Sequence, residues 1–144
     1  MDWTIEFDKA IEQYLPDLEV LQDEPMSRHT TFRIGGPAKR MAFPSSREQL
    51  VLLMSFAKDY GANPLVIGNG SNLLVPDEGL DRLVIDTSAN LNRVERGSEN
   101  TVLADAGATL ARTADLACKS GLTGLEFAHG IPGTLGGGIV MNAG

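Results

Sequence analysis

Two glycine-rich loops carry the residue types in this sequence that are suited to chemistry. The first is GNGSN at residues 68–72, and the second is GIPGTLGGG at residues 130–138. Glycine has no Cβ, so it reaches positive φ at little steric cost and lets backbone N–H groups converge on an anion. Each loop also offers hydroxyl or amide side chains and follows an apolar segment. Together the loops are predicted to grip a pyrophosphate group from two sides.

Common phosphate-binding motifs fit these loops poorly. After Gly68 and Gly70, the third glycine of the dinucleotide fingerprint would fall at Leu73, where no helix pattern begins. The second loop lacks the Lys-Ser/Thr pair of a Walker A loop. Two simpler interpretations stay open, because GNGSN also suits a plain turn and a glycine-rich run also suits a flexible tail. If a ligand is present, the pattern favours a nucleotide cofactor bound by a less common fold.

The composition limits the classes of partner. The chain of 144 residues suits one domain, and its hydrophobic content of 42% is enough for a core. Its net charge is −7, from 12 basic and 19 acidic residues without a Lys/Arg cluster, which argues against a nucleic-acid partner. The acidic N-terminus does not resemble a signal peptide, and no stretch approaches the ~18 apolar residues of a membrane span. We therefore expect a soluble, cytoplasmic protein with no membrane partner.

The single cysteine, Cys118, excludes an intrachain disulfide and a multi-cysteine metal site. It lies in the apolar helical stretch LACKSGL. We predict a small core residue there, with a reactive thiol as the alternative. No metal site is expected.

The N-terminal part of the chain predicts one helix and then a connector. Apolar residues share one helical face over residues 3–15, and Pro16 ends that pattern. Residues 19–28 are predicted to be a polar connector. Residues 29–38 are predicted to be a β-rich run broken by a tight turn at its two glycines.

A small βαββ unit follows. Ser45 and Ser46 both have capping-box spacing for a helix, and Gly61 suits its C-terminal stop. The strands of this unit are predicted at residues 39–43, 64–68 and 82–86.

A second unit is predicted after the polar stretch 87–100. It contains a strand near residues 100–107 and then a helix with Thr109 as its N-cap. The buried stripe of that helix is expected at Leu110, Ala114 and Ala117, and Gly121 closes it. A short helix is also predicted to begin within the terminal run TLGGGIVMNAG.

Four ordered motifs carry a resemblance to a known family. They are HTTFRIGGPA, VIGNGSNLLV, AGATL and LTGLEFAHGIPGTLGGGIVMNAG, which together span residues 29–144. In this order and spacing they resemble the UDP-N-acetylenolpyruvoylglucosamine reductases, which use FAD and NADPH to make a peptidoglycan precursor. Two positions depart from the family pattern: His129 stands where a small residue is more common, and Gly138 where alanine is common.

The resemblance implies an α+β FAD-binding module of the vanillyl-alcohol-oxidase type, with the cofactor between two subdomains. Its implied divisions are an N-terminal helix and connector at 1–28, a complete first subdomain at 29–88 and a truncated second subdomain at 89–144, with the substrate domain absent. The residues implied to bind FAD are Gly68, Asn69, Gly70, Ser71 and Asn72 in the first loop, and Ile131, Pro132, Gly133, Thr134, Gly136 and Gly137 in the second.

The family reaction is hydride transfer from NADPH through FAD to the enolpyruvyl UDP-sugar, with a proton delivered by a general acid. The resemblance places the serine, glutamate and arginine that assist it after residue 144. No catalytic residue is therefore expected in this chain, which is expected to be inactive alone. Apolar residues of a truncated subdomain, such as Leu135, Ile139 and Val140, are expected to lack partners and to favour self-association.

Two other functions stay open at this point. One is a different flavin oxidase or dehydrogenase, with covalent flavin on His129 or Cys118. The other is a non-enzymatic nucleotide-binding module. Structural roles are favoured for His129 and His29, whereas Arg33 suits either phosphate neutralisation or solvent exposure equally.

Overall fold

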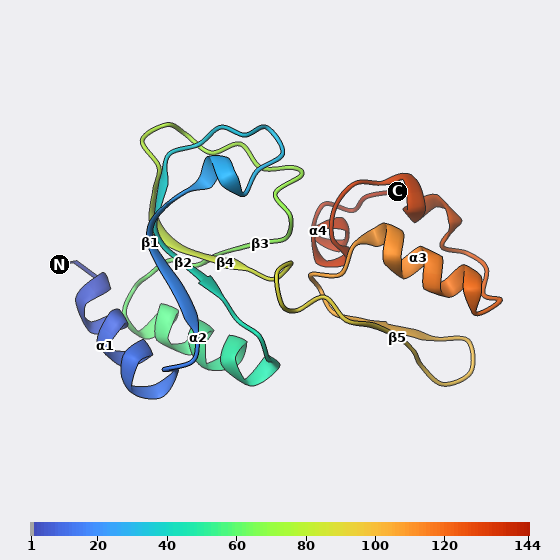
Figure 1. Cartoon of the computed structure of the whole chain (residues 1–144), viewed down its shortest axis with the longest axis horizontal. Coiled ribbons are helices and arrows are strands. Elements are labelled where there is room, and N and C mark those ends of the chain that lie inside the picture. The colour runs from blue at the N-terminus through green and yellow to red at the C-terminus, as the bar shows by residue number, and fades with distance from the viewer. Residues whose placement is uncertain (1) are drawn as a thin grey trace.

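The computed structural model describes residues 2–144, which form two lobes side by side (Figure 1). We call residues 2–88 the first lobe and residues 89–144 the second lobe. The strand that ends at Asp86 leads from one lobe into the other. None of the described helices has the length and apolar character needed to span a bilayer.

The first lobe is a four-stranded sheet in the order β1-β2-β4-β3. Strand β1 pairs antiparallel with β2, whereas β2 and β3 both pair parallel with β4. The carboxyl ends of the three parallel strands therefore lie at one edge of the sheet. The elements of this lobe are α1 (Thr4–Tyr14), β1 (Glu19–Pro25), η1 (Met26–Arg28), β2 (Pro37–Phe43), α2 (Arg47–Asp59), β3 (Leu65–Ile67) and β4 (Leu80–Asp86).

Both helices of the first lobe cover the same face of its sheet. Phe7 of α1 and Leu53 of α2 are fully buried in one apolar cluster with Leu83 and Ile85 of β4. Because side chains alternate along a strand, Val84 points to the other face. There it packs in a second cluster with residues of η1 and of the segment after β3.

Helix α1 is also held to the sheet by polar contacts. The Arg40 guanidinium on β2 donates to both carboxylate oxygens of Asp8, at 2.9 Å from Nε to Oδ1 and 2.6 Å from Nη2 to Oδ2. Lys39 bridges Asp2 and Asp81 at 3.2 and 3.1 Å. The pKa of the Arg40 guanidinium is raised mainly by its hydrogen bonds to Asp8.

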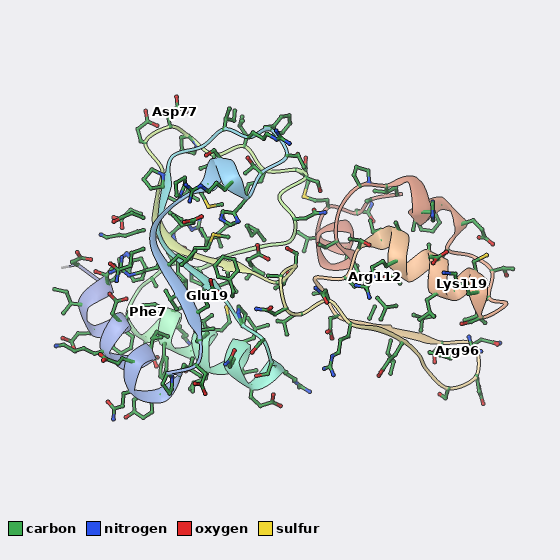
Figure 2. The ribbon with its side chains drawn as sticks, viewed as in Figure 1. Phe7, Glu19, Asp77, Arg96, Arg112 and Lys119 are labelled. Carbon is green, nitrogen blue, oxygen red and sulfur yellow. The ribbon has the colours of Figure 1, made fainter. Side chains whose placement is uncertain are left out.

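The second lobe is built from shorter elements. Two antiparallel strands, β5 and β6, form a hairpin, and α3 packs against them and against η2. Charged side chains such as Arg96 on β5 and Lys119 on α3 lie on its surface (Figure 2). The elements are β5 (Val94–Arg96), β6 (Val102–Ala104), α3 (Leu110–Lys119), η2 (Glu126–Gly130) and α4 (Leu135–Val140).

The helix boundaries agree closely with those expected from sequence. Ser46 caps α2 by accepting a hydrogen bond from the Gln49 N–H, and Gln49 Oε1 in turn accepts from Ser45. Thr109 caps α3 in the same way through the Arg112 N–H. Gly61 and Gly121 follow α2 and α3 with φ of 72° and 71°, the left-handed conformation of a helix stop.

Most of the predictions for residues 19–38 were wrong, although residues 37 and 38 do belong to a strand, β2. Residues 19–25 form the edge strand β1 instead of a connector, and its polar sequence is tolerated because an edge strand is half exposed. Residues 29–36 contain no strand. The turn of this segment lies at residues 31–32 and not at the glycines, since the Gly35 and Gly36 carbonyls accept from backbone N–H groups of η1. Gly36 packs against the backbone of Asp77 so closely that a Cβ would overlap it.

Three further expectations in the second lobe need correction. Residues 87–100, predicted to be a polar stretch before the second unit, contain β5, which pairs with β6. Cys118 is exposed, because it follows Ala117 by about 100° around α3 and so leaves the buried stripe. Leu135 does have partners, since it packs against the cluster of Leu110, whereas Ile139 and Val140 are exposed as expected.

Candidate functional site

The first glycine loop begins where β3 ends, at the edge of the sheet that holds the carboxyl ends of the parallel strands. Ligands of open α/β sheets bind outside this kind of edge. Gly70 has a φ of 68°, and a Cβ at that position would overlap the backbone carbonyl of His29. Glycine is therefore required there for both its conformation and its small size.

The first loop is supported from behind by the segment after η1. The Thr31 N–H donates to the Gly70 carbonyl at 3.1 Å. Next to it, His29 Nε2 lies 2.9 Å from Glu24 Oε1, and both side chains are mostly buried. His29 thus has a carboxylate partner that its sequence neighbours did not reveal. The contact ties β1 to the backbone that holds Gly70.

The second glycine loop is positioned by the N-termini of α3 and α4. The Leu110 N–H donates to the Gly133 carbonyl at 3.0 Å, and the Leu135 N–H donates to the Ala108 carbonyl at 2.7 Å. These two bonds pair Thr134 with Thr109, the caps of α4 and α3. Thr134 is buried, and its hydroxyl accepts from the Gly137 N–H.

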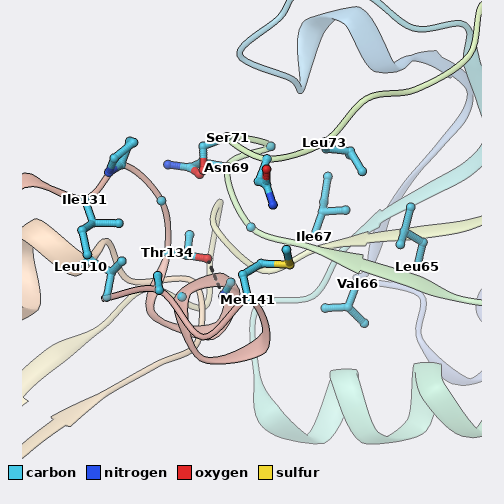
Figure 3. Close-up of a pocket in the computed structure, with 18 residues that line it drawn as sticks. Leu65, Val66, Ile67, Asn69, Ser71, Leu73, Leu110, Ile131, Thr134 and Met141 are labelled. Carbon is cyan, nitrogen blue, oxygen red and sulfur yellow. Dashed lines mark hydrogen bonds between the residues drawn. The ribbon is translucent and has the colours of Figure 1, made fainter. Parts of the chain in front are cut away.

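The two loops are in direct contact across the junction of the lobes (Figure 3). A Cβ on Gly68 would overlap the side-chain oxygen of Thr134. A Cβ on Gly133, whose φ is 130°, would lie 3.0 Å from Ser71 Oγ. The glycines therefore allow two backbones from different lobes to approach each other closely.

The contacting loops line one cavity of about 370 Å³, a size within the range of small-molecule sites. Gly136 is the predicted residue that does not line it, since its N–H donates to the Ala106 carbonyl instead. The predicted residues that do line the cavity are Gly68, Asn69, Gly70, Ser71, Asn72, Ile131, Pro132, Gly133, Thr134 and Gly137.

Sequence reasoning predicted Ile131 and Pro132 but missed the rest of the apolar lining. Leu65, Val66 and Leu73 flank the first loop, and Leu110 and Met141 come from the second lobe. Nothing in the sequence separates these residues from ordinary core residues, because their role depends on where the two lobes meet.

The cavity has hydrogen-bond donors but no charged side chain. Within residues 2–144, the backbone N–H groups of residues 69–72, Gly133 and Thr134 donate to no protein acceptor. None of the lining residues is acidic, basic or otherwise titratable. An anionic group bound here would be held by backbone N–H dipoles, which is how glycine-rich loops bind phosphates.

Cys118 and His129 lie elsewhere. Both line a different cavity, formed by α3 and the segment that leads into η2. Arg33 is exposed and lines yet another cavity, which shares Asn69 with the one between the loops. Among the described residues, no group of three or more His, Cys, Asp or Glu side chains is placed to hold a metal ion.

Comparison with known proteins gives a consistent picture. A protein family described as an FAD binding domain matches residues 38–144. The UDP-N-acetylenolpyruvoylglucosamine reductase of Agathobacter rectalis is 46% identical over 149 residues, covering 96% of this chain and 47% of that protein. The chain thus spans about half the length of this relative.

Solved structures share the fold. The UDP-N-acetylenolpyruvylglucosamine reductase of Thermus caldophilus superimposes with a TM-score of 0.62 and 33% identity, over 88% of this chain and 42% of that one. Cholesterol oxidase of Brevibacterium sterolicum matches with a TM-score of 0.65 at 17% identity, over 89% of this chain and 25% of that one. The expected fold, an α+β FAD-binding module of the vanillyl-alcohol-oxidase type, is therefore confirmed.

Proposed function

This chain belongs to the FAD-binding domain family. From that membership and its 46% identity to the Agathobacter rectalis protein, we propose that it forms the FAD-binding part of a UDP-N-acetylenolpyruvoylglucosamine reductase. The observation that carries the proposal is that two glycine loops, one from each lobe, line the same cavity. We place the boundary between two FAD-binding subdomains near residue 88. Helix α1 and strand β1 share the core of the first subdomain.

The residues of the cavity fit FAD in both of its chemical characters. Its pyrophosphate needs donors, and the N–H groups of residues 69–72, Gly133 and Thr134 are free to serve it. Its ring systems need apolar contact, which Leu73, Ile131 and Met141 offer. Close approach of the cofactor to the backbone requires the glycines already identified.

When bound, FAD would supply hydride transfer between NADPH and the enolpyruvyl group of a UDP-sugar. The chain's own residues would bind and orient the cofactor and shield it from water. They would not deliver the proton that the reaction needs, because no titratable side chain lines the cavity. We propose that the general acid and the groups that bind the UDP-sugar belong to the rest of the reductase.

Titration with FAD tests the binding proposal, with two glycine variants as a matched pair. Gly70 and Gly61 have φ of 68° and 72°, so alanine is strained by about 1–2 kcal/mol at either position. Only at Gly70 would the new Cβ also meet protein atoms. We expect Gly70→Ala to weaken FAD affinity about tenfold or more and Gly61→Ala to leave it unchanged. Equal affinities of the two variants would contradict the assigned site.

An activity measurement tests the second part of the proposal. NADPH oxidation driven by the enolpyruvyl UDP-sugar should be absent with this chain alone, even when FAD is bound. Turnover by the chain alone would show that a proton donor lies within it.

Two rival functions make different predictions. Covalent flavin attachment has little support, because Cys118 and His129 do not line the cavity between the loops. Retention of flavin mass after denaturation would revive it. A module without a flavin is tested by the same FAD titration. Self-association through Ile139 and Val140 stays a prediction, which light scattering can test.

A further inference from the structure

A second cavity, of about 440 Å³, lies beside the one between the glycine loops and shares Asn69 with it. It is formed by the segment after η1 and by the carboxyl end of β4. Its lining is opposite in character, because every residue in it is polar or charged. The lining residues are Arg28, His29, Thr30, Thr31, Arg33, Asn69, Asp86 and Ser88.

The charge in this polar cavity favours an anion. Two guanidinium groups face one carboxylate, in a chain whose net charge is −7. Arg33 forms no ion pair with any residue in the described part of the chain. The nearest carboxylate oxygen to Arg28 is Glu24 Oε1 at 3.7 Å, and that oxygen already lies 2.9 Å from His29 Nε2. Both arginines therefore keep donors for a ligand.

Asp86 adds a hydrogen-bond acceptor to the same cavity. Its residue is only 6% exposed. Its Oδ1 accepts three hydrogen bonds, from the Ser88 N–H and hydroxyl at 2.7 Å each and from the Ala89 N–H at 3.1 Å. Its Oδ2 accepts none from residues 2–144. Since every buried side-chain oxygen of residues 2–144 has a hydrogen-bond partner, Oδ2 is open to the cavity, where it can accept a hydrogen bond from a ligand hydroxyl.

Arg33, which lines this cavity, also has an unusual backbone conformation. Its φ is 56°, a left-handed conformation that is uncommon for a long side chain. The turn is fixed by the Arg33 N–H, which donates to the Thr30 carbonyl at 3.1 Å, and by the Thr30 hydroxyl, which donates to the Ile34 carbonyl at 3.1 Å. Such a conformation persists only where surrounding contacts hold it, and these two hydrogen bonds fix Arg33 at the edge of the cavity.

We propose that this polar cavity binds the phosphate group of a phosphorylated sugar. Arg28 and Arg33 would donate to the phosphate, and Asp86 Oδ2 would accept from a hydroxyl of the sugar. Asn69 and Thr31 belong to the same lining and to the support of the FAD loop. The phosphorylated sugar has two possible sources: the adenosine-phosphate part of FAD reaching past Asn69, or a separate molecule.

Calorimetric titration with ribose 5-phosphate and with inorganic phosphate tests the proposal on the FAD-free and the FAD-loaded chain. Arg33→Asn removes the charge and keeps a residue that tolerates a left-handed backbone. We expect it to weaken ribose 5-phosphate binding about tenfold or more, as for a lost hydrogen bond to a charged group. Arg47→Gln, at an exposed position on α2, makes the same change in charge and should have no effect.

A second variant tests recognition of the sugar separately from recognition of the phosphate. Asp86→Asn keeps Oδ1 for its three hydrogen bonds and replaces the free oxygen. It should weaken ribose 5-phosphate about tenfold without weakening inorganic phosphate.

Titration of the FAD-loaded chain with ribose 5-phosphate identifies the source of the phosphate. Binding of ribose 5-phosphate that persists with FAD present identifies a separate molecule. Competition between the two, with weaker FAD binding by Arg33→Asn, identifies the cofactor itself. The proposal would be overturned if Arg33→Asn and Arg47→Gln had the same affinity for ribose 5-phosphate and also the same affinity for FAD. Ribose 5-phosphate binding that depends on Arg33 in a chain without FAD affinity would refute only the proposed function.

Discussion

The two lobes differ in how much apolar surface they cover by themselves. The largest fully buried side chains of the molecule, Phe7, Met41 and Leu53 among them, all belong to the first lobe. The buried apolar residues of the second lobe are four alanines and Leu110, while Ile139, Val140 and Met141 are exposed at 72%, 82% and 59%. The cleft proposed to bind FAD thus has one wall on a well-packed lobe and one on a lobe with a thin core.

The largest expected effect is on the free energy of unfolding when a leucine is replaced by alanine in each lobe. Leu53 is fully buried, and Leu103 on β6 is 56% exposed. Leu53→Ala should lower the free energy of unfolding by about 2–5 kcal/mol, because it leaves a cavity in the core. Leu103→Ala should change it by less than about 0.5 kcal/mol. Urea unfolding followed by circular dichroism measures both, and similar losses would remove the proposed contrast.

A helix-cap pair should produce a smaller effect. Ser46 and Thr109 cap α2 and α3 with the same kind of hydrogen bond. Ser46→Ala should lower the free energy of global unfolding by about 1 kcal/mol. Thr109→Ala should instead speed hydrogen exchange within α3, because a thin core lets that lobe open locally. If Thr109→Ala lowers the same global transition equally, the lobes unfold as one unit.

The smallest expected effect is on the fall of Tm in acid, to which Asp2, just before α1 in the first lobe, contributes. Hydrogen bonds from the Thr4 N–H and hydroxyl, and then Lys39, lower the pKa of Asp2 from 3.8 to about 2. Because the folded-state pKa lies below the unfolded one, the stabilisation is present above about pH 4 and is lost as the pH falls through about 2. Asp2→Asn should flatten the fall in Tm across this range. An unchanged slope would assign the acid sensitivity to other groups.

Much of the fold could be predicted from sequence because local signals were strong. The caps Ser46 and Thr109, and the stops Gly61 and Gly121, act through backbone groups a few residues away. Strand β1 could not be predicted, since its polar residues are stabilised by pairing with β2. The exposure of Cys118 depended on a rotation of one residue around α3, which an apolar stretch does not resolve.

Part of the candidate site could be predicted from the sequence, and part could not. Its glycines were visible because close backbone approach and positive φ restrict a position to glycine, as at Gly70. The Glu24–His29 contact and the burial of Asp86 could not be predicted, because they depend on residues that only the fold brings together. The family resemblance supplied the identity of the cofactor, which no pattern of residues could have given.

The central claim is that FAD is held by backbone N–H groups from both lobes at once. Hydrogen exchange of the chain with and without FAD tests it directly, residue by residue. We predict that FAD slows exchange of the amides of residues 69–72 and also of Gly133 and Thr134, while amides of the β5–β6 hairpin are unaffected. Slower exchange in only one of the two loops would contradict the claim.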